Sequence, residues 1–165
     1  MTVTTSGNLN FNVTSIKDQD LGEAKFPASL GVALTLADGT AANQVDLAFS
    51  DTRTTATEEL DLSGVLTDSF GDTITFARVK GILIKAASAN TLDVYVGGAV
   101  ANGFITPFVD ATDKVVVKAG GALFFWAPDA TAFAVAAGTG DLLKIAASDG
   151  ATPITYDIII IGASA

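Results

Sequence analysis

Near its C-terminal end the chain carries the sequence YDIIIIG at residues 156–162. Successive side chains of a β-strand point to opposite faces, so the first and third isoleucines share one face while the second and fourth share the other. Both faces of this strand are therefore apolar, and both need cover. In a two-sheet sandwich one face meets the core and the other normally meets water. The run predicts a strand whose outer face is covered by a second surface, most simply another subunit.

The same two-faced pattern recurs at residues 81–84, 115–117 and 123–126. Left bare, such strands are aggregation-prone. Assembly into an oligomer accounts for all of them, because closed symmetry buries matching patches against one another. The side chains that we expect at a contact with another subunit or another protein are Val116, Leu123, Phe124, Phe125, Trp126, Ile158, Ile159, Ile160 and Ile161.

Further from this run, the chain shows the alternation of half-buried strands. At residues 8–14 the odd positions are Leu, Phe and Val, and the even positions are Asn or Thr. Residues 30–37 alternate in the same way and end at Asp38-Gly39, a hairpin-type turn. We expect a strand in each of these segments, with one apolar face.

The longest strand candidate, residues 73–85, changes its apolar phase at Lys80-Gly81, where we expect a β-bulge. About ten short strands follow one another along the chain, with turn signals between them and no long helix. The composition agrees, with 15 Asp against 3 Glu, 20 Thr and 16 Gly. We predict an all-β fold, a two-sheet antiparallel sandwich of jelly-roll type. An immunoglobulin-type sandwich is the alternative.

The length of 165 residues predicts one domain. Residues 1–7 are rich in Thr and Ser and have no strong structural preference. We expect them to form a flexible N-terminal arm that becomes ordered against a neighbouring molecule. Residues 8–165 form the expected single β-sandwich domain.

The chain contains no cysteine and no histidine. This composition excludes disulfides, thiol chemistry, Cys or His zinc sites and a Ser-His-Asp triad. Asp110, Asp113 and Asp129 carry oxygen ligands suited to calcium, but their spacing is not that of a calcium loop, and turn capping explains them. We expect no catalytic, cofactor-binding or metal-binding residue, and therefore no enzyme.

A formal net charge of −9, with nine basic residues, disfavours nucleic acid and anionic membranes as partners. No basic segment followed by an apolar run marks a signal peptide. The apolar runs are also far shorter than the ~20 residues that a membrane span needs. We expect a protein that is not secreted through a signal peptide and does not bind membranes.

Seven turn-plus-strand stretches resemble small structural proteins of tailed bacteriophages, namely capsid decoration (cement) proteins and other head or tail accessory proteins. They are residues 57–64, 66–71, 79–85, 90–92, 127–129, 140–145 and 156–162. The resemblance implies a virion component that is β-rich, often trimeric and assembled in the host cytoplasm. The family has no catalytic residues to carry over onto this chain.

The leading hypothesis is a capsid decoration protein, a homotrimer that binds the phage major capsid protein and stabilises the head by bridging its subunits. One alternative is a tail or head-fibre component with an adhesin role. Another is a carbohydrate-binding β-sandwich module, in which Trp126 would stack on a sugar ring.

Overall fold

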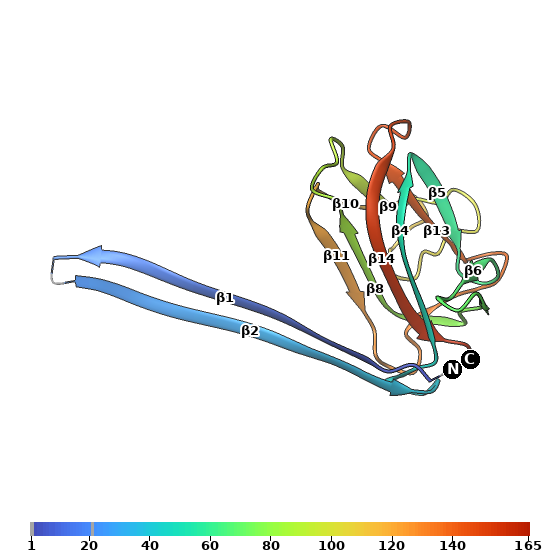
Figure 1. The fold of residues 1–165 in the computed structure, drawn as a ribbon, viewed down its shortest axis with the longest axis horizontal. Helices are drawn as coiled ribbons and strands as arrows, with labels where there is room; N and C mark the ends of the chain where they lie inside the picture. The colour runs from blue at the N-terminus through green and yellow to red at the C-terminus, as the bar shows by residue number, and fades with distance from the viewer. Residues whose placement is uncertain (1, 21) are drawn as a thin grey trace.

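The fold is built from strands alone (Figure 1). The computed structural model describes residues 2–20 and 22–165, and among them it has fourteen strands and no helix. A five-stranded and a four-stranded antiparallel sheet pack against each other around a shared core, so the predicted all-β sandwich is confirmed. Four strands are only two residues long, namely β3 (Gln44–Val45), β6 (Leu66–Thr67), β7 (Thr73–Ile74) and β12 (Phe133–Ala134).

The first sheet, which we call the β14 sheet, contains in order β11 (Ala122–Trp126), β8 (Arg78–Ala86), β14 (Ile154–Ala163) and β4 (Leu47–Thr55), and the short β12 also pairs with β8. The second, the β13 sheet, contains in order β10 (Lys114–Val117), β9 (Val94–Gly97), β13 (Leu142–Ala147) and β5 (Thr57–Asp61). Their pairing is nested, because β4 pairs with β14 and the next strand, β5, pairs with β13. The earliest long strands of the sandwich, β4 and β5, are therefore each paired with one of the last two strands of the chain, β14 and β13.

The main core lies between the two sheets and is built from alternate residues of each strand. Ile158 and Ile160 of β14 are fully buried there, as are Leu143 and Ile145 of β13. Each buried side chain of this size stabilises the fold by roughly 1.5–3 kcal/mol. The burial follows the period of two that a half-buried strand requires.

The expected β-bulge is confirmed at Lys80 in β8. Ile161 of β14 is paired with Gly81, and Gly162 with Val79, so Lys80 is the extra residue. The Lys80 side chain is buried, and its Nζ donates to the carbonyl oxygen of Ala41. Burial, with the nearby charge of Arg78, lowers the pKa of this lysine.

A long two-stranded hairpin projects from the sandwich into solvent (Figure 1). It is formed by β1 (Thr5–Gln19) and β2 (Gly22–Asp38), which are antiparallel with fifteen paired residues on each strand. At a rise of about 3.4 Å per residue the hairpin is about 50 Å long. We call this hairpin the arm; Leu21 lies outside the described residues.

A second, smaller cluster attaches the arm to the sandwich. Its buried members are Val3, Leu36, Val45 and Ile161, with Ala48 and Trp126 packed against them. The backbone N–H of Val3 donates to Asp38 Oδ1 at 2.8 Å, and the end of β2 pairs in parallel with β3. Because Ile161 belongs to β14, the arm is anchored on an interior strand of the sandwich.

The chain divides differently from the expected boundary at residues 7 and 8. Residues 8–38, which we expected in the sandwich, lie in the arm, and the first long sandwich strand begins at Leu47. Within the expected N-terminal arm, Val3 is buried and Thr5–Gly7 are paired in β1, while Met1 lies outside the described residues. An alternating sequence looks the same in a sandwich strand and in a free ribbon, so the boundary depends on pairing that the pattern does not encode.

Candidate functional site: an interaction surface

The arm has one apolar and one polar face. Residues directly opposite each other in an antiparallel pair point to the same face, and Leu9 lies opposite Val32, as Phe11 does opposite Leu30. The opposite face carries Asn8, Asn10 and Asn12, paired with Ala33, Gly31 and Ser29. The large side chains of the apolar face are Leu9, Phe11, Val13, Phe26, Leu30, Val32, Leu34 and Leu36.

Exposure on this apolar face increases from the base of the arm to its tip. Leu36 at the base is only 1% exposed, Phe11 is 61% exposed, and Phe26 near the tip is 74% exposed. The segments 5–16 and 26–37 contain no charged residue, and the charges of the arm lie at its tip and at Asp38. A lone two-stranded hairpin is marginally stable in water, so a ribbon of this kind requires a covering surface.

A groove of about 730 Å³ lies between the base of the arm and the outer face of the β14 sheet. We call it the arm groove. The sheet contributes uncharged side chains from β8, β11 and β14, and the arm contributes its apolar face as far as Phe11 and Leu34. The lining residues are Thr4, Thr5, Ser6, Gly7, Asn8, Leu9, Phe11, Leu34, Gly81, Leu83, Ala122, Phe124, Trp126, Ile159 and Ile161.

Four of the nine contact residues expected from the sequence meet in the arm groove, namely Phe124, Trp126, Ile159 and Ile161. The rings of Phe124 and Trp126 are stacked, with centroids 5.8 Å apart. Ile159 is 46% exposed, whereas Ile161 is also part of the cluster at the arm base. The part of the outer face of the β14 sheet that lines the arm groove is therefore apolar, whereas Lys85 and Asp157 lie on the same face further along the strands.

The other five expected contact residues lie elsewhere, and four of them face the core. Ile158 and Ile160 are buried in the main core, and Leu123 and Phe125 pack against it. These four side chains point inward because a sandwich strand gives every second residue to the core. Val116 is exposed on β10, which belongs to the β13 sheet, and it does not line the groove.

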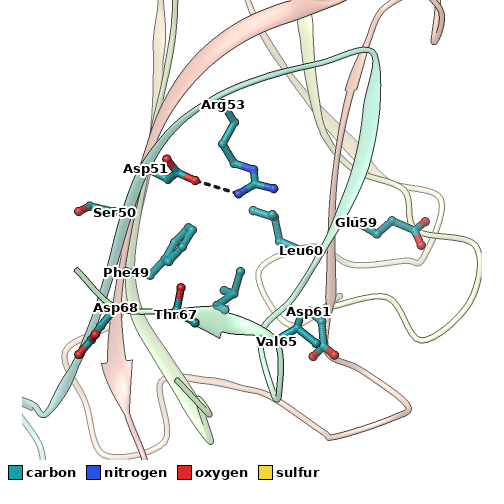
Figure 2. Close-up of a pocket in the computed structure, with 11 residues that line it drawn as sticks. Phe49, Ser50, Asp51, Arg53, Glu59, Leu60, Asp61, Val65, Thr67 and Asp68 are labelled. Atoms are coloured by element: carbon teal, nitrogen blue, oxygen red, sulfur yellow. Dashed lines mark hydrogen bonds and ion pairs between the residues drawn. The ribbon is translucent and has the colours of Figure 1, made fainter. Parts of the chain in front are cut away.

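A second hollow, of about 370 Å³, lies beside β4, β5 and β6 and is more polar (Figure 2). Figure 2 shows Phe49, Arg53 and Leu60 pointing toward it, whereas Glu59, Asp61 and Asp68 point away. Arg53 forms an ion pair with Asp51, with 2.9 Å between Arg53 Nη1 and Asp51 Oδ2. The carboxylates at this hollow do not converge on one point, which a pair of catalytic acids requires.

A partly buried polar network lies next to this hollow. The Tyr156 hydroxyl donates to Glu58 Oε1 at 2.8 Å, and Arg53 Nε donates to Glu58 Oε2 at 2.7 Å. Burial, together with the Glu58 hydrogen bond, raises the pKa of Tyr156 above its ordinary value. The ring of Tyr156 belongs to the main core, so the network satisfies the one polar atom of a core residue.

The aspartates considered as calcium ligands are used in their own turns. Asp110 Oδ1 accepts hydrogen bonds from the backbone N–H and the hydroxyl of Thr112, and Asp113 Oδ2 accepts one from the Asp110 N–H. Asp129 Oδ1 likewise accepts from the backbone N–H groups of Thr131 and Ala132. Across residues 2–20 and 22–165, no group of three or more Asp or Glu is placed to hold a metal ion.

Asp149 accepts turn hydrogen bonds of the same kind, and they predict a loss of stability in acid. Three donors from Ala151 and Thr152 to the Asp149 carboxylate, the Thr152 hydroxyl first among them, lower its pKa to about 2. A carboxylate whose folded pKa is depressed contributes stability above its unfolded pKa, near 3.8, and loses it as the pH falls toward the folded value. We expect the unfolding free energy to drop between about pH 4 and pH 2, and less steeply in Asp149→Asn. Urea unfolding at pH 5 and pH 2.5 gives the change in unfolding free energy for each protein. An equal change in the unaltered chain and in Asp149→Asn would contradict the prediction.

Sequence reasoning missed the outer part of the arm as an exposed apolar surface. Phe11, Phe26 and Leu30 are among the most exposed large apolar residues that the structure describes. A signal was present, since two alternating segments free of charge flank a short charged turn. Read together, they would have indicated an amphipathic hairpin.

None of the described residues forms a helix long and apolar enough to cross a membrane. Comparison with protein-family models, curated proteins and solved structures finds no match to this chain.

Proposed function

We propose that this chain is a structural protein of a phage virion, a capsid decoration protein that oligomerises and bridges subunits of the major capsid protein. The observation that carries the proposal is the arm. Its apolar face is uncharged along residues 5–16 and 26–37, a length of about 40 Å, and is largely uncovered by its own chain. A surface of this size on a β protein indicates an interaction with other proteins.

The fold also suits a role in assembly. We read the nested pairing of β4 with β14 and of β5 with β13 as the winding of a jelly roll. Jelly rolls are common in viral shells, because two closed sheets form a stiff block with protected edges. A stiff block with a projecting ribbon can occupy one position on a lattice while its arm contacts the next molecule.

Stabilisation of the head would follow from selective binding. A protein that binds the expanded capsid lattice and not the unexpanded one shifts the equilibrium toward the expanded form by mass action. Each bound copy that contacts two capsid subunits also opposes their separation. The net charge of −9 keeps the exposed part of the protein away from other acidic surfaces.

The test is to mix the purified chain with undecorated expanded capsids and with unexpanded procapsids of its phage. We expect it to co-sediment with expanded capsids at a fixed copy number and to raise their temperature of disruption. Procapsids are the control and should bind little. Absence of binding to expanded capsids would overturn the assignment to the capsid, and a few dozen copies or fewer on intact virions would indicate the tail or a vertex instead.

A further inference from the structure

The outer half of the arm lies beyond the reach of its own sandwich. The arm groove extends along the hairpin only as far as Phe11 on β1 and Leu34 on β2. Val13 and Phe26 lie nearer the tip, and Leu30 lies opposite Phe11 on β2, all outside the groove. Val13, Phe26 and Leu30 are 58%, 74% and 70% exposed. Because the small cluster fixes the base of the arm, its own sandwich leaves these side chains available to another molecule.

The arm groove has the chemical character of the surface that needs cover. None of the fifteen residues lining the groove is charged, and residues 26–30 and 11–15 of the outer arm are also uncharged. An uncharged apolar face loses nothing when it is buried against another, whereas a charged partner would have to desolvate its charges. The match favours a second apolar protein surface over nucleic acid, membrane headgroups or an acidic peptide.

The two surfaces also match in length. The apolar outer stretch of the arm covers five residues on each strand, from Phe11 to Ser15 and from Phe26 to Leu30. The groove face of β11 covers five residues as well, from Ala122 to Trp126. At about 3.4 Å per residue, each stretch is about 17 Å long.

The available area is sufficient for a stable complex. The exposed apolar surface of the arm, together with that of Leu83, Phe124 and Ile159, is on the order of 800 Å² per molecule. This is about the area that a standard protein–protein interface buries on each partner. Each molecule has one outer arm and one groove, so two copies of this chain already supply both halves of the contact.

We infer that the outer arm of one copy lies in the arm groove of a second copy. The inference deepens the proposed assembly role and rests on it, since it names the partner of the apolar surface. An arm that enters a neighbour's groove makes a head-to-tail contact, and contacts of this type close into a ring when the rotation between copies permits. The homotrimer expected from the sequence is one such ring.

The absence of cysteine makes a direct test available. One set of chains carries Ala28→Cys, on the apolar face opposite Val13, and a second, differently tagged set carries Ile159→Cys in the groove. The two sets are co-expressed and oxidised. We expect a disulfide-linked dimer that contains one chain of each set, because a disulfide forms only when the two Cα atoms come within about 7 Å.

The matched control moves the arm cysteine by one residue. Ser29→Cys lies opposite Asn12 on the polar face and should give a several-fold lower yield of the mixed dimer with Ile159→Cys. Dimers linked only between two Ala28→Cys chains would show that arms pair with arms, and would overturn the inference. A chain carrying Ala28→Cys and Ile159→Cys together that closes on itself as a monomer would overturn it too, because the arm would then fold back onto its own groove.

A second measurement requires no cross-link. We expect sedimentation to give an oligomeric mass for the unaltered chain and a monomeric mass for the double variant Phe26→Ser with Leu30→Ser. Both positions are exposed, so the variant and the unaltered chain should unfold at the same denaturant concentration when both are compared as monomers. A monomeric unaltered chain, or an oligomer that survives in the variant, would count against arm exchange.

The outcome is separable from that of the capsid experiment. Mixed disulfides without any capsid binding would leave arm exchange standing and remove the proposed function. Capsid binding by a chain that is monomeric and forms no mixed disulfide would do the reverse, and would make a capsid subunit the occupant of the groove.

Discussion

Replacing Ile160 with alanine lowers the free energy of unfolding by about 2–5 kcal/mol. Ile160 is 0% exposed and lies in the main core, in the interior strand β14 between β8 and β4. The substitution removes three carbons and leaves a cavity, and strands paired on both sides have little freedom to move and fill it. Chemical denaturation of the isolated chain measures the loss.

Ile159 is the control, because it is the next residue on the same strand and points to the opposite face. At 46% exposure in the isolated chain, Ile159→Ala should cost well under half as much as Ile160→Ala. Ile159 also lines the arm groove, so its replacement should weaken the contact between copies that we propose. Equal losses in the isolated chain would mean that β14 is not oriented as described.

Gly162→Ala is expected to destabilise the sandwich by about 1–3 kcal/mol, toward the upper end of the range for overpacking. A β-carbon at this position would overlap the carbonyl oxygen of Arg78 and would come within 2.6 Å of the Phe76 ring. The closest of these atoms, the carbonyl oxygen of Arg78, belongs to the backbone and cannot rotate away from the added β-carbon as a side chain can. The site is next to the bulge, where β14 changes register against β8.

Gly64→Ala provides the comparison for this effect. The nearest atom to a β-carbon there is Asp61 Oδ2, at an ordinary contact distance of 3.7 Å. We expect this variant to be neutral or slightly more stable, because alanine reduces the freedom of the unfolded chain. Thermal unfolding of both variants checks the prediction, and similar midpoints for the two would contradict it.

The sequence predicted the strands and the fold class because alternation reports local geometry directly. The shift of apolar phase at Lys80 located the bulge, and the pattern of residues 8–14 and 30–37 gave both faces of the arm. These features depend on the backbone of a single strand, so a short stretch of residues contains the information.

Pairing between distant strands was beyond the same reasoning. The run at 158–161 indicated two apolar faces, but not which face enters the core, so Ile158 and Ile160 were included with the contact residues. The boundary of the arm was missed for a related reason, since β1 and β2 pair with each other and not with the sandwich. Alternation is identical in both settings, and only the partner strand distinguishes them.

The nested pairing of the sandwich determines the order in which this protein forms. β4 pairs with β14, which lies more than one hundred residues later, so at about 5–20 residues per second the ribosome delivers the partner of β4 roughly ten seconds late. The arm needs no such delay, because its strands are adjacent and a hairpin closes within about 1–10 μs. Both strands of the arm are thus made well before β14, and the cluster that fixes the base of the arm on the sandwich is completed only when Ile161 arrives.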